Sequence, residues 1–161
     1  TASNFFYVPV PINTGAAAGV TPIGMFAQLS FVGSQTLDMA NSGYTNVAAA
    51  GAYTEMITNG FVGTLASGAL SNVVAGYYGI HGRLSYVPAT EKVTELEIFV
   101  NETQNENLAA FHYQPSAGST NTLNVSGIVY LPAGSGVTMR IKQNATTDFD
   151  IVRAILTIGS P

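Results

Sequence analysis

The sequence predicts an all-β fold, an antiparallel sandwich of two sheets. From Gly76 to the C-terminus, apolar and polar residues alternate in short runs, which is typical of strands with one buried face. Clusters of glycine, proline and asparagine separate these runs, as turns do between antiparallel strands. We therefore expect one sandwich domain over residues 25–161, preceded by an ordered N-terminal arm over residues 1–24.

The region before Gly76 carries weaker strand signals. Residues 26–32 (FAQLSFV) are the first candidate strand. Residues 48–56 contain alanines, which favour a helix, but also Gly51 and Tyr53, so we expect irregular structure or a strand there. Residues 61–74 alternate small and apolar side chains, which is typical of a strand with bends at its glycines.

Clearer strands follow, and each ends at a turn signal. They cover residues 76–87, 93–100, 123–131, 137–142 and 151–158. Because side chains alternate across a strand, Leu96 and Ile98 should face the core, while Glu95 and Glu97 should face solvent.

The last of these strands differs, because strict alternation leaves both of its faces apolar. Phe149, Ile151 and Ile155 fall on one face, and Val152, Ala154, Leu156 and Ile158 fall on the other. A sandwich buries only one face of each strand in its core, so the second face should cover a neighbouring subunit. The residues that we expect in the core or in a subunit interface are Tyr78, Ile80, Phe149, Val152, Leu156 and Ile158.

The charge content predicts partners. Charged residues make up 9% of the chain, against about 25% in typical soluble domains. Only Asp38, Glu55 and Arg83 are charged before Glu91. A chain that is 47% hydrophobic with so few charges should cover its surface with copies of itself or with neighbours in a larger particle.

Composition also excludes several classes of function. The five basic residues are scattered and the net charge is −4, so no basic stripe is available to bind nucleic acid. Pro9, Pro11 and Pro22 interrupt the uncharged N-terminal region, which leaves no apolar stretch of about 20 residues to span a membrane. The chain has no cysteine for disulfides or thiolate metal sites.

The order of motifs after residue 75 resembles the C1q/TNF-like jelly-roll superfamily. Residues 76–80 (GYYGI) are similar to its Gly-x-Tyr-x-Ile strand. Residues 96–101 (LEIFVN) resemble the strand that ends in Asn-Gly in the family, and Glu102 stands here in place of that glycine.

Two further segments extend the resemblance to residue 158. Residues 126–141 (SGIVYLPAGSGVTMRI) resemble the next two strands and their turn, with Ser135-Gly136 where the family usually has an aspartate. Residues 149–158 occupy the place of the buried C-terminal strand. The resemblance implies a ten-strand jelly roll, a tight homotrimer and termini that meet at its base.

The resemblance also implies a role in multivalent display. We expect a non-enzymatic trimeric head of a viral or phage spike or fibre, at the virion surface, that binds a host receptor or glycan and contacts a shaft or capsid protein. One alternative is a secreted or spore-surface C1q-like domain that caps a collagen-like stalk. Another is a capsid jelly-roll subunit.

Candidate catalytic and metal-binding residues are few. His81 and His112 are far apart in sequence, and no Gly-x-Ser-x-Gly motif supplies a nucleophile, so we predict no enzymatic activity. Glu95 and Glu97 have the spacing of paired glycosidase carboxylates, but an outward strand face makes a solvated pair the simpler interpretation. Asp148 and Asp150 fit no calcium-loop pattern, so we predict neither a metal nor a cofactor.

The candidate ligand-binding residues are Phe111, His112, Tyr113 and Gln114. They fall in residues 102–119, a segment rich in asparagine and glutamine that we expect to be a loop. Aromatic rings could stack on a sugar while the histidine and glutamine form hydrogen bonds to it. The alternative is that these aromatic residues pack against their own domain or a neighbouring subunit.

Overall fold

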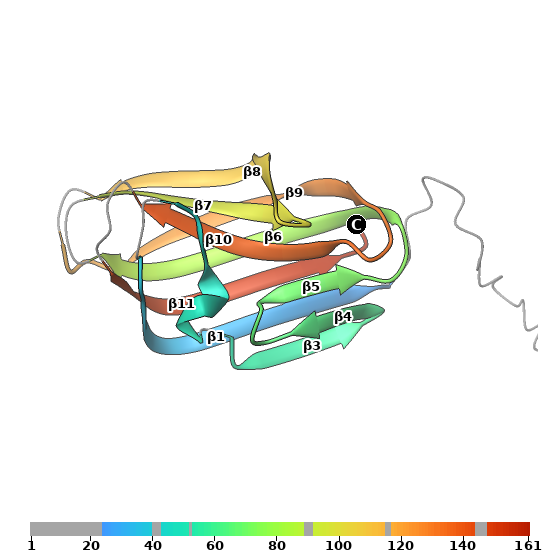
Figure 1. Cartoon of the computed structure of the whole chain (residues 1–161), viewed down its shortest axis with the longest axis horizontal. Coiled ribbons are helices and arrows are strands. Elements are labelled where there is room, and N and C mark those ends of the chain that lie inside the picture. The colour runs from blue at the N-terminus through green and yellow to red at the C-terminus, as the bar shows by residue number, and fades with distance from the viewer. Residues whose placement is uncertain (1–23, 40–42, 52, 89–91, 115–116, 144–147) are drawn as a thin grey trace, which may run out of the picture.

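The computed structural model describes residues 24–39, 43–51, 53–88, 92–114, 117–143 and 148–161. These residues form a two-layer β-sandwich (Figure 1). Its elements in chain order are β1 (Phe26–Leu37), β2 (Thr45–Asn46), the short 3₁₀ helix η1 (Val47–Ala50), β3 (Glu55–Asn59), β4 (Phe61–Thr64), β5 (Ala69–Asn72), β6 (Gly76–Pro88), β7 (Lys92–Val100), β8 (Thr103–Gln114), β9 (Asn121–Leu131), β10 (Gly136–Gln143) and β11 (Phe149–Gly159). The expected arm over residues 1–24 lies outside the described residues, except for Gly24.

The two sheets have jelly-roll topology. The first has the strand order β3-β1-β11-β6-β9, and we call it the β11 sheet. The second has the order β4-β5-β10-β7-β8, with β2 also paired to β10, and we call it the β10 sheet. Every neighbouring pair is antiparallel, and strands distant in sequence, such as β1 and β11, lie side by side (Figure 1). The predicted two-sheet antiparallel fold is therefore confirmed.

Both ends of the described chain meet at one end of the sandwich. The backbone N–H of Ser160 donates to the carbonyl of Met25 at 2.9 Å, and the N–H of Gly24 donates to Ser160 Oγ at 3.0 Å. The resemblance implied this arrangement. It leaves the opposite end of the sandwich, at the left of Figure 1, distant from both described ends.

The core lies between the sheets and is aromatic as well as aliphatic. Tyr78 packs edge-on against Phe61 with ring centroids 5.4 Å apart, and Tyr86 packs likewise against Phe149 at 5.6 Å. Each large apolar side chain that is fully buried contributes roughly 1.5–3 kcal/mol through the hydrophobic effect. Five of the residues expected in the core or an interface are buried within one subunit: Tyr78, Ile80, Phe149, Leu156 and Ile158.

A β-bulge corrects the prediction for the last strand. The register of β11 against β6 shifts between Ile151 and Arg153, so one extra residue is inserted there. The shift brings Ile151 and Ala154 onto the same side of the sheet, and both are buried. Leu156 thus faces the core, whereas Val152 and Ile155 are only half-buried. The predicted split of this strand into two apolar faces was therefore wrong, because a bulge breaks the two-residue period.

Residues 103–114 also differ from the prediction. They form the edge strand β8 rather than a loop. Most of its side chains are exposed, and Leu108 and Gln114 are its buried residues. An edge strand with so few buried positions lacks the apolar alternation by which strands are recognised in sequence.

The region of mixed signals before β3 contains the helical turn. Asn46 caps η1, because its side-chain oxygen accepts from the N–H of Ala48, and Gly51 ends it with φ of 67°. The expected irregular stretch therefore begins with one helical turn and ends in β3. No helix in the described part of the chain is long and apolar enough to cross a membrane.

Candidate functional site

The outer face of the β11 sheet, which points away from the core, carries exposed large apolar side chains on several of its strands. Val32, Ile57 and Ile128 on this face are 68%, 56% and 65% exposed. Tyr77 and Tyr130 lie opposite each other on β6 and β9, with ring centroids 5.3 Å apart, and both rings are exposed. Exposed large apolar side chains gathered on one face indicate a candidate protein–protein contact.

A row of mostly polar residues crosses this face from one edge of the sheet to the other. Residues directly opposite on neighbouring strands share a face. Thus Ile57 on β3 is followed by Gln28 on β1, Thr157 on β11, His81 on β6 and Ser126 on β9. His81 therefore lies on this face, one strand in from the β9 edge, and its side chain is exposed.

The predicted ligand-binding residues separate onto the two sides of β8. Phe111 is 78% exposed and lies opposite Glu95, while Tyr113 is 54% exposed and lies opposite Val93. Together Val93, Phe111 and Tyr113 form what we call the β8 rim, on the outer face of the β10 sheet. His112 points to the other side of the strand, and Gln114 is buried, so the structure does not bring all four predicted residues together.

A layer of polar and aromatic side chains covers the middle of the outer face of the β10 sheet. The Tyr44 hydroxyl donates to Glu97 Oε2 at 2.5 Å, and Gln104 Nε2 donates to the same oxygen at 2.9 Å. The Tyr44 ring packs edge-on against Phe99, and the Arg140 guanidinium lies 4.5 Å from the centre of the Phe99 ring. We call these five residues the Glu97 layer.

The Glu97 layer corrects the prediction that Glu95 and Glu97 form a solvated pair. Glu97 points outward from its strand but is 0% exposed, because the layer covers it. Burial, followed by the nearby Glu97 and Glu95 carboxylates, raises the pKa of the Tyr44 phenol far above its usual value. This phenol therefore stays protonated and continues to donate its hydrogen bond to Glu97 Oε2.

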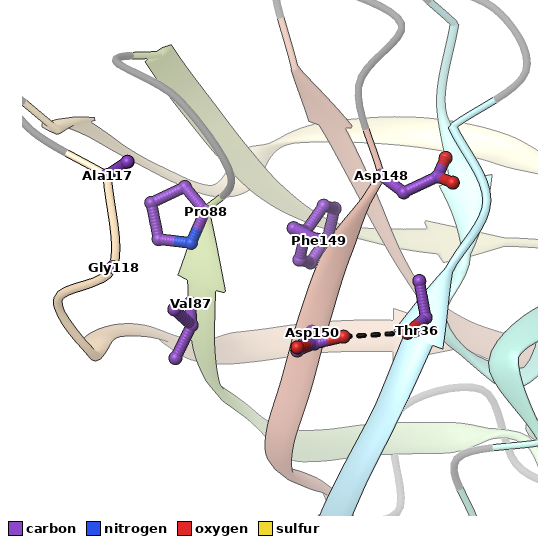
Figure 2. Close-up of a pocket in the computed structure, with 8 residues that line it drawn as sticks. All are labelled: Thr36, Val87, Pro88, Ala117, Gly118, Asp148, Phe149 and Asp150. Atoms are coloured by element: carbon purple, nitrogen blue, oxygen red, sulfur yellow. Dashed lines mark hydrogen bonds between the residues drawn. The ribbon is translucent and has the colours of Figure 1, made fainter.

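An open pocket of about 450 Å³ lies at the end of the sandwich away from Gly24 and Ser160 (Figure 2). Val87, Pro88 and Phe149 supply its apolar wall, and Asp148 and Asp150 supply carboxylates. Thr36 Oγ1 donates to Asp150 Oδ1 at 2.7 Å, as the dashed line in Figure 2 marks.

The aspartates of this pocket serve the fold. The N–H of Met39 donates to Asp148 Oδ1 at 3.1 Å, so each carboxylate fixes the end of β1. Among the described residues, no group of three or more histidine, cysteine, aspartate or glutamate side chains is placed to hold a metal ion. A second open pocket, of about 490 Å³, lies between β8 and β9 and includes Tyr130 in its wall.

Sequence reasoning missed the apolar outer face and the Glu97 layer. A signal for the first was present, because residues 128–131 (IVYL) are apolar at every position, and alternation then leaves Ile128 and Tyr130 outside the core. No comparable signal pointed to Tyr44, which reaches Glu97 from a segment distant in sequence.

Comparisons with known proteins support the fold. No family model matches the chain, and no curated protein matches its sequence. Among solved structures, murine APRIL is similar with a TM-score of 0.54 and 12% identity, over 84% of this chain and 99% of that one. Eiger TNF from S. frugiperda is similar with a TM-score of 0.59 and 12% identity, over 85% of this chain and 93% of that one. The chain therefore has a TNF-like jelly-roll fold.

Proposed function

We propose that this chain is the subunit of a homotrimeric, non-enzymatic head domain. The observation that carries the proposal is the set of exposed apolar side chains on the outer face of the β11 sheet, where Val32, Ile57 and Ile128 are each more than half exposed in the single chain. Covering this face with copies of the same chain would remove the apolar surface from water. The TNF-like fold supports a trimer as the form of this assembly.

We further propose that the trimer presents a surface for attachment to a host receptor or glycan. The β8 rim lies on the other sheet, so it stays accessible when the β11 sheet is covered. Phe111 and Tyr113 lie two residues apart on one side of a strand, about 6.5–7 Å along its axis. Two exposed rings at that spacing form a platform that could stack on sugar rings or pack against a protein loop.

The location that we favour is a viral or phage spike or fibre at the virion surface, with a shaft or capsid protein as a further partner. The meeting of Gly24 and Ser160 at one end of the sandwich supports a head mounted at that end. A secreted or spore-surface domain on a collagen-like stalk uses the same geometry and is the second candidate. A capsid subunit would instead be covered by lattice neighbours.

The assembly is tested by light scattering on the purified chain. We expect about three times the chain mass of 16.7 kDa. Ile128→Asp should reduce the mass to that of one chain, because it places a charge in the covered face. Val62→Asp is the matched control, since Val62 is 61% exposed on the other sheet, and it should leave the mass unchanged. A wild-type monomer at high micromolar concentration would contradict the proposal.

Attachment is tested separately with a glycan array and immobilised host-cell membrane proteins. Binding that Phe111→Ser and Tyr113→Ser both remove, with the trimer intact, is the expected result. Binding that survives both substitutions would move the attachment site away from the β8 rim.

A further inference from the structure

A single cross-strand row on the outer face of the β11 sheet carries an acid on the edge strand β3 and a cation on β6, three strands away. Glu55 on β3 lies opposite Ser30 on β1, which lies opposite Ile155 on β11, which lies opposite Arg83 on β6. All four side chains therefore point out of the same face. Three strand spacings separate the backbones of Glu55 and Arg83, which is about 14 Å.

Arg83 has no partner for its charge among the described residues of its own subunit. The side chain is half-buried, and its Nε atom is buried without a hydrogen-bond partner. Its neighbours across the strands are Ile155 and Asn124, and the described residues place no carboxylate within ion-pair distance of it. Burying a charged guanidinium without a carboxylate nearby costs free energy, so pairing with an acid would stabilise this arginine.

Arg140 on the β10 sheet is a second partly buried arginine, and it does have partners within its own subunit. Its Nε is also buried without a partner, but its guanidinium pairs with Glu102 and lies over the Phe99 ring. Arg83 has neither kind of contact in the described structure. The contrast points to a partner for Arg83 beyond the described residues of its own subunit.

Glu55 has the complementary character. It is exposed on the edge strand β3, and the Ser30 hydroxyl donates to its Oε2 at 3.3 Å. This contact leaves most of the carboxylate available. Ile57, two residues further along the same face, is 56% exposed, so the acid sits next to apolar surface that also needs cover.

We propose that in the assembly Arg83 of one copy pairs with Glu55 of the partner subunit, and that this pair sets the register of the contact. The inference rests on the proposed function, because it requires the outer face to meet a second copy. A cyclic contact joins two different parts of the same surface. The β3 edge carries an acid and β6, three strands away, carries a cation, so the face supplies two complementary parts, and like charges would meet in a wrong register.

Charge reversal tests the pair. Arg83→Glu and Glu55→Arg should each weaken assembly by about tenfold or more in light scattering across a dilution series, because each brings like charges together. The double variant should regain the wild-type dissociation midpoint. Glu102→Arg makes the same change of charge on the other sheet and should leave the midpoint unchanged, and thermal melting of every variant checks folding.

Mixing the two single variants shows whether the pair joins different copies. In a mixed assembly, the new carboxylate at position 83 of one variant would meet the new guanidinium at position 55 of the other. Mixing should therefore recover part of the trimer that each variant loses alone. A double variant that recovers without any recovery on mixing would place the pair within one subunit and overturn the inference. A double variant that fails to recover, while folded, would overturn it as well.

These experiments distinguish failure of the proposed trimer from failure of the proposed pair between Arg83 and Glu55. If the wild-type chain is a monomer at all concentrations, the proposed assembly itself is wrong. If the wild-type chain is a trimer but charge reversal has no effect, the assembly stands and the pairing of Arg83 with Glu55 is wrong.

Discussion

The outer faces of the two sheets differ in how far side chains of the same subunit cover them. On the β10 sheet, the Glu97 layer covers the middle of the face with side chains of the same subunit, and Glu97 and Phe99 are buried although they point outward. On the β11 sheet, no such layer forms among the described residues, and Ile128 remains 65% exposed. The comparison shows that the chain covers the middle of one face with its own side chains and leaves the other face exposed, and it is this second face that we propose is covered by copies of the chain.

The chemistry of the two faces explains the difference. The β10 sheet draws on Tyr44, which lies just before β2, so a segment of the chain crosses this face. The outer face of the β11 sheet carries Val32, Tyr77 and Ile128 with few charges, and alternation along its strands keeps them outside the core. Apolar side chains gain most from burial by another apolar surface, and in the proposed assembly copies of the chain would provide one.

The largest predicted effect separates core from interface on one strand. Leu156→Asp should prevent stable folding, at a cost of about 4 kcal/mol or more, because it buries an unpaired charge at a position that is 0% exposed. Ile155→Asp, one residue earlier on the outer face, should give a folded chain that no longer assembles. Circular dichroism with thermal melting separates the two, and a folded monomer from Leu156→Asp would show that β11 has no bulge.

A smaller effect tests whether the Glu97 layer stabilises the outer face of the β10 sheet within one subunit. Tyr44→Phe removes a donor to the buried Glu97 carboxylate and should cost about 1–3 kcal/mol in urea unfolding. Tyr113→Phe, which removes a hydroxyl on the same sheet from a ring that is 54% exposed, is the matched control and should cost less. Equal costs for the two variants would argue against a role for the Glu97 layer.

The same contact has a consequence at high pH. The pKa of Tyr44 is raised in the folded chain, so its stabilising contribution is complete below the unfolded pKa of about 10 and is lost as the pH rises toward the folded value. The wild-type chain should therefore lose stability above about pH 10 more steeply than Tyr44→Phe. Urea midpoints between about pH 8 and pH 11 measure this, and parallel curves would contradict the assignment.

The smallest predicted effect concerns the β8 rim. Phe111→Ser should change the free energy of unfolding by less than about 0.5 kcal/mol, because the ring is 78% exposed and covers little of the core. It should also leave the mass of the assembly unchanged. A large loss of stability would mean that Phe111 packs against a surface of the assembly rather than being presented for attachment.

The sequence predicted the strands with a regular pattern and failed where the pattern is interrupted. Strands β6, β7 and β10 alternate and were found with nearly their full extent. The bulge in β11 inserts one residue, which reverses the inside and outside positions after Ile151, and no residue type marks that point. Strand β8 was missed because an edge strand needs few apolar residues.

The candidate surfaces were harder to predict than the fold. Phe111 and Tyr113 are exposed, which their predicted ligand-binding role requires, but Gln114 alternates into the interior once β8 is a strand. Glu97 was expected in solvent, because the pattern of its own strand says nothing about Tyr44, which reaches it across the sheet. The row from Glu55 to Arg83 depends on the order of the strands, which sequence periodicity does not contain.

The most direct test compares oxidation of aromatic residues on the two outer faces by hydroxyl-radical footprinting across a concentration series. At assembling concentrations, Tyr77 and Tyr130 on the β11 sheet should be protected, while Phe111 and Tyr113 on the β8 rim should be oxidised readily. On dilution, protection of Tyr77 and Tyr130 should be lost and the β8 rim should not change. Oxidation of all four residues at similar, concentration-independent rates would contradict the claim that the β11 sheet is completed by copies of the chain.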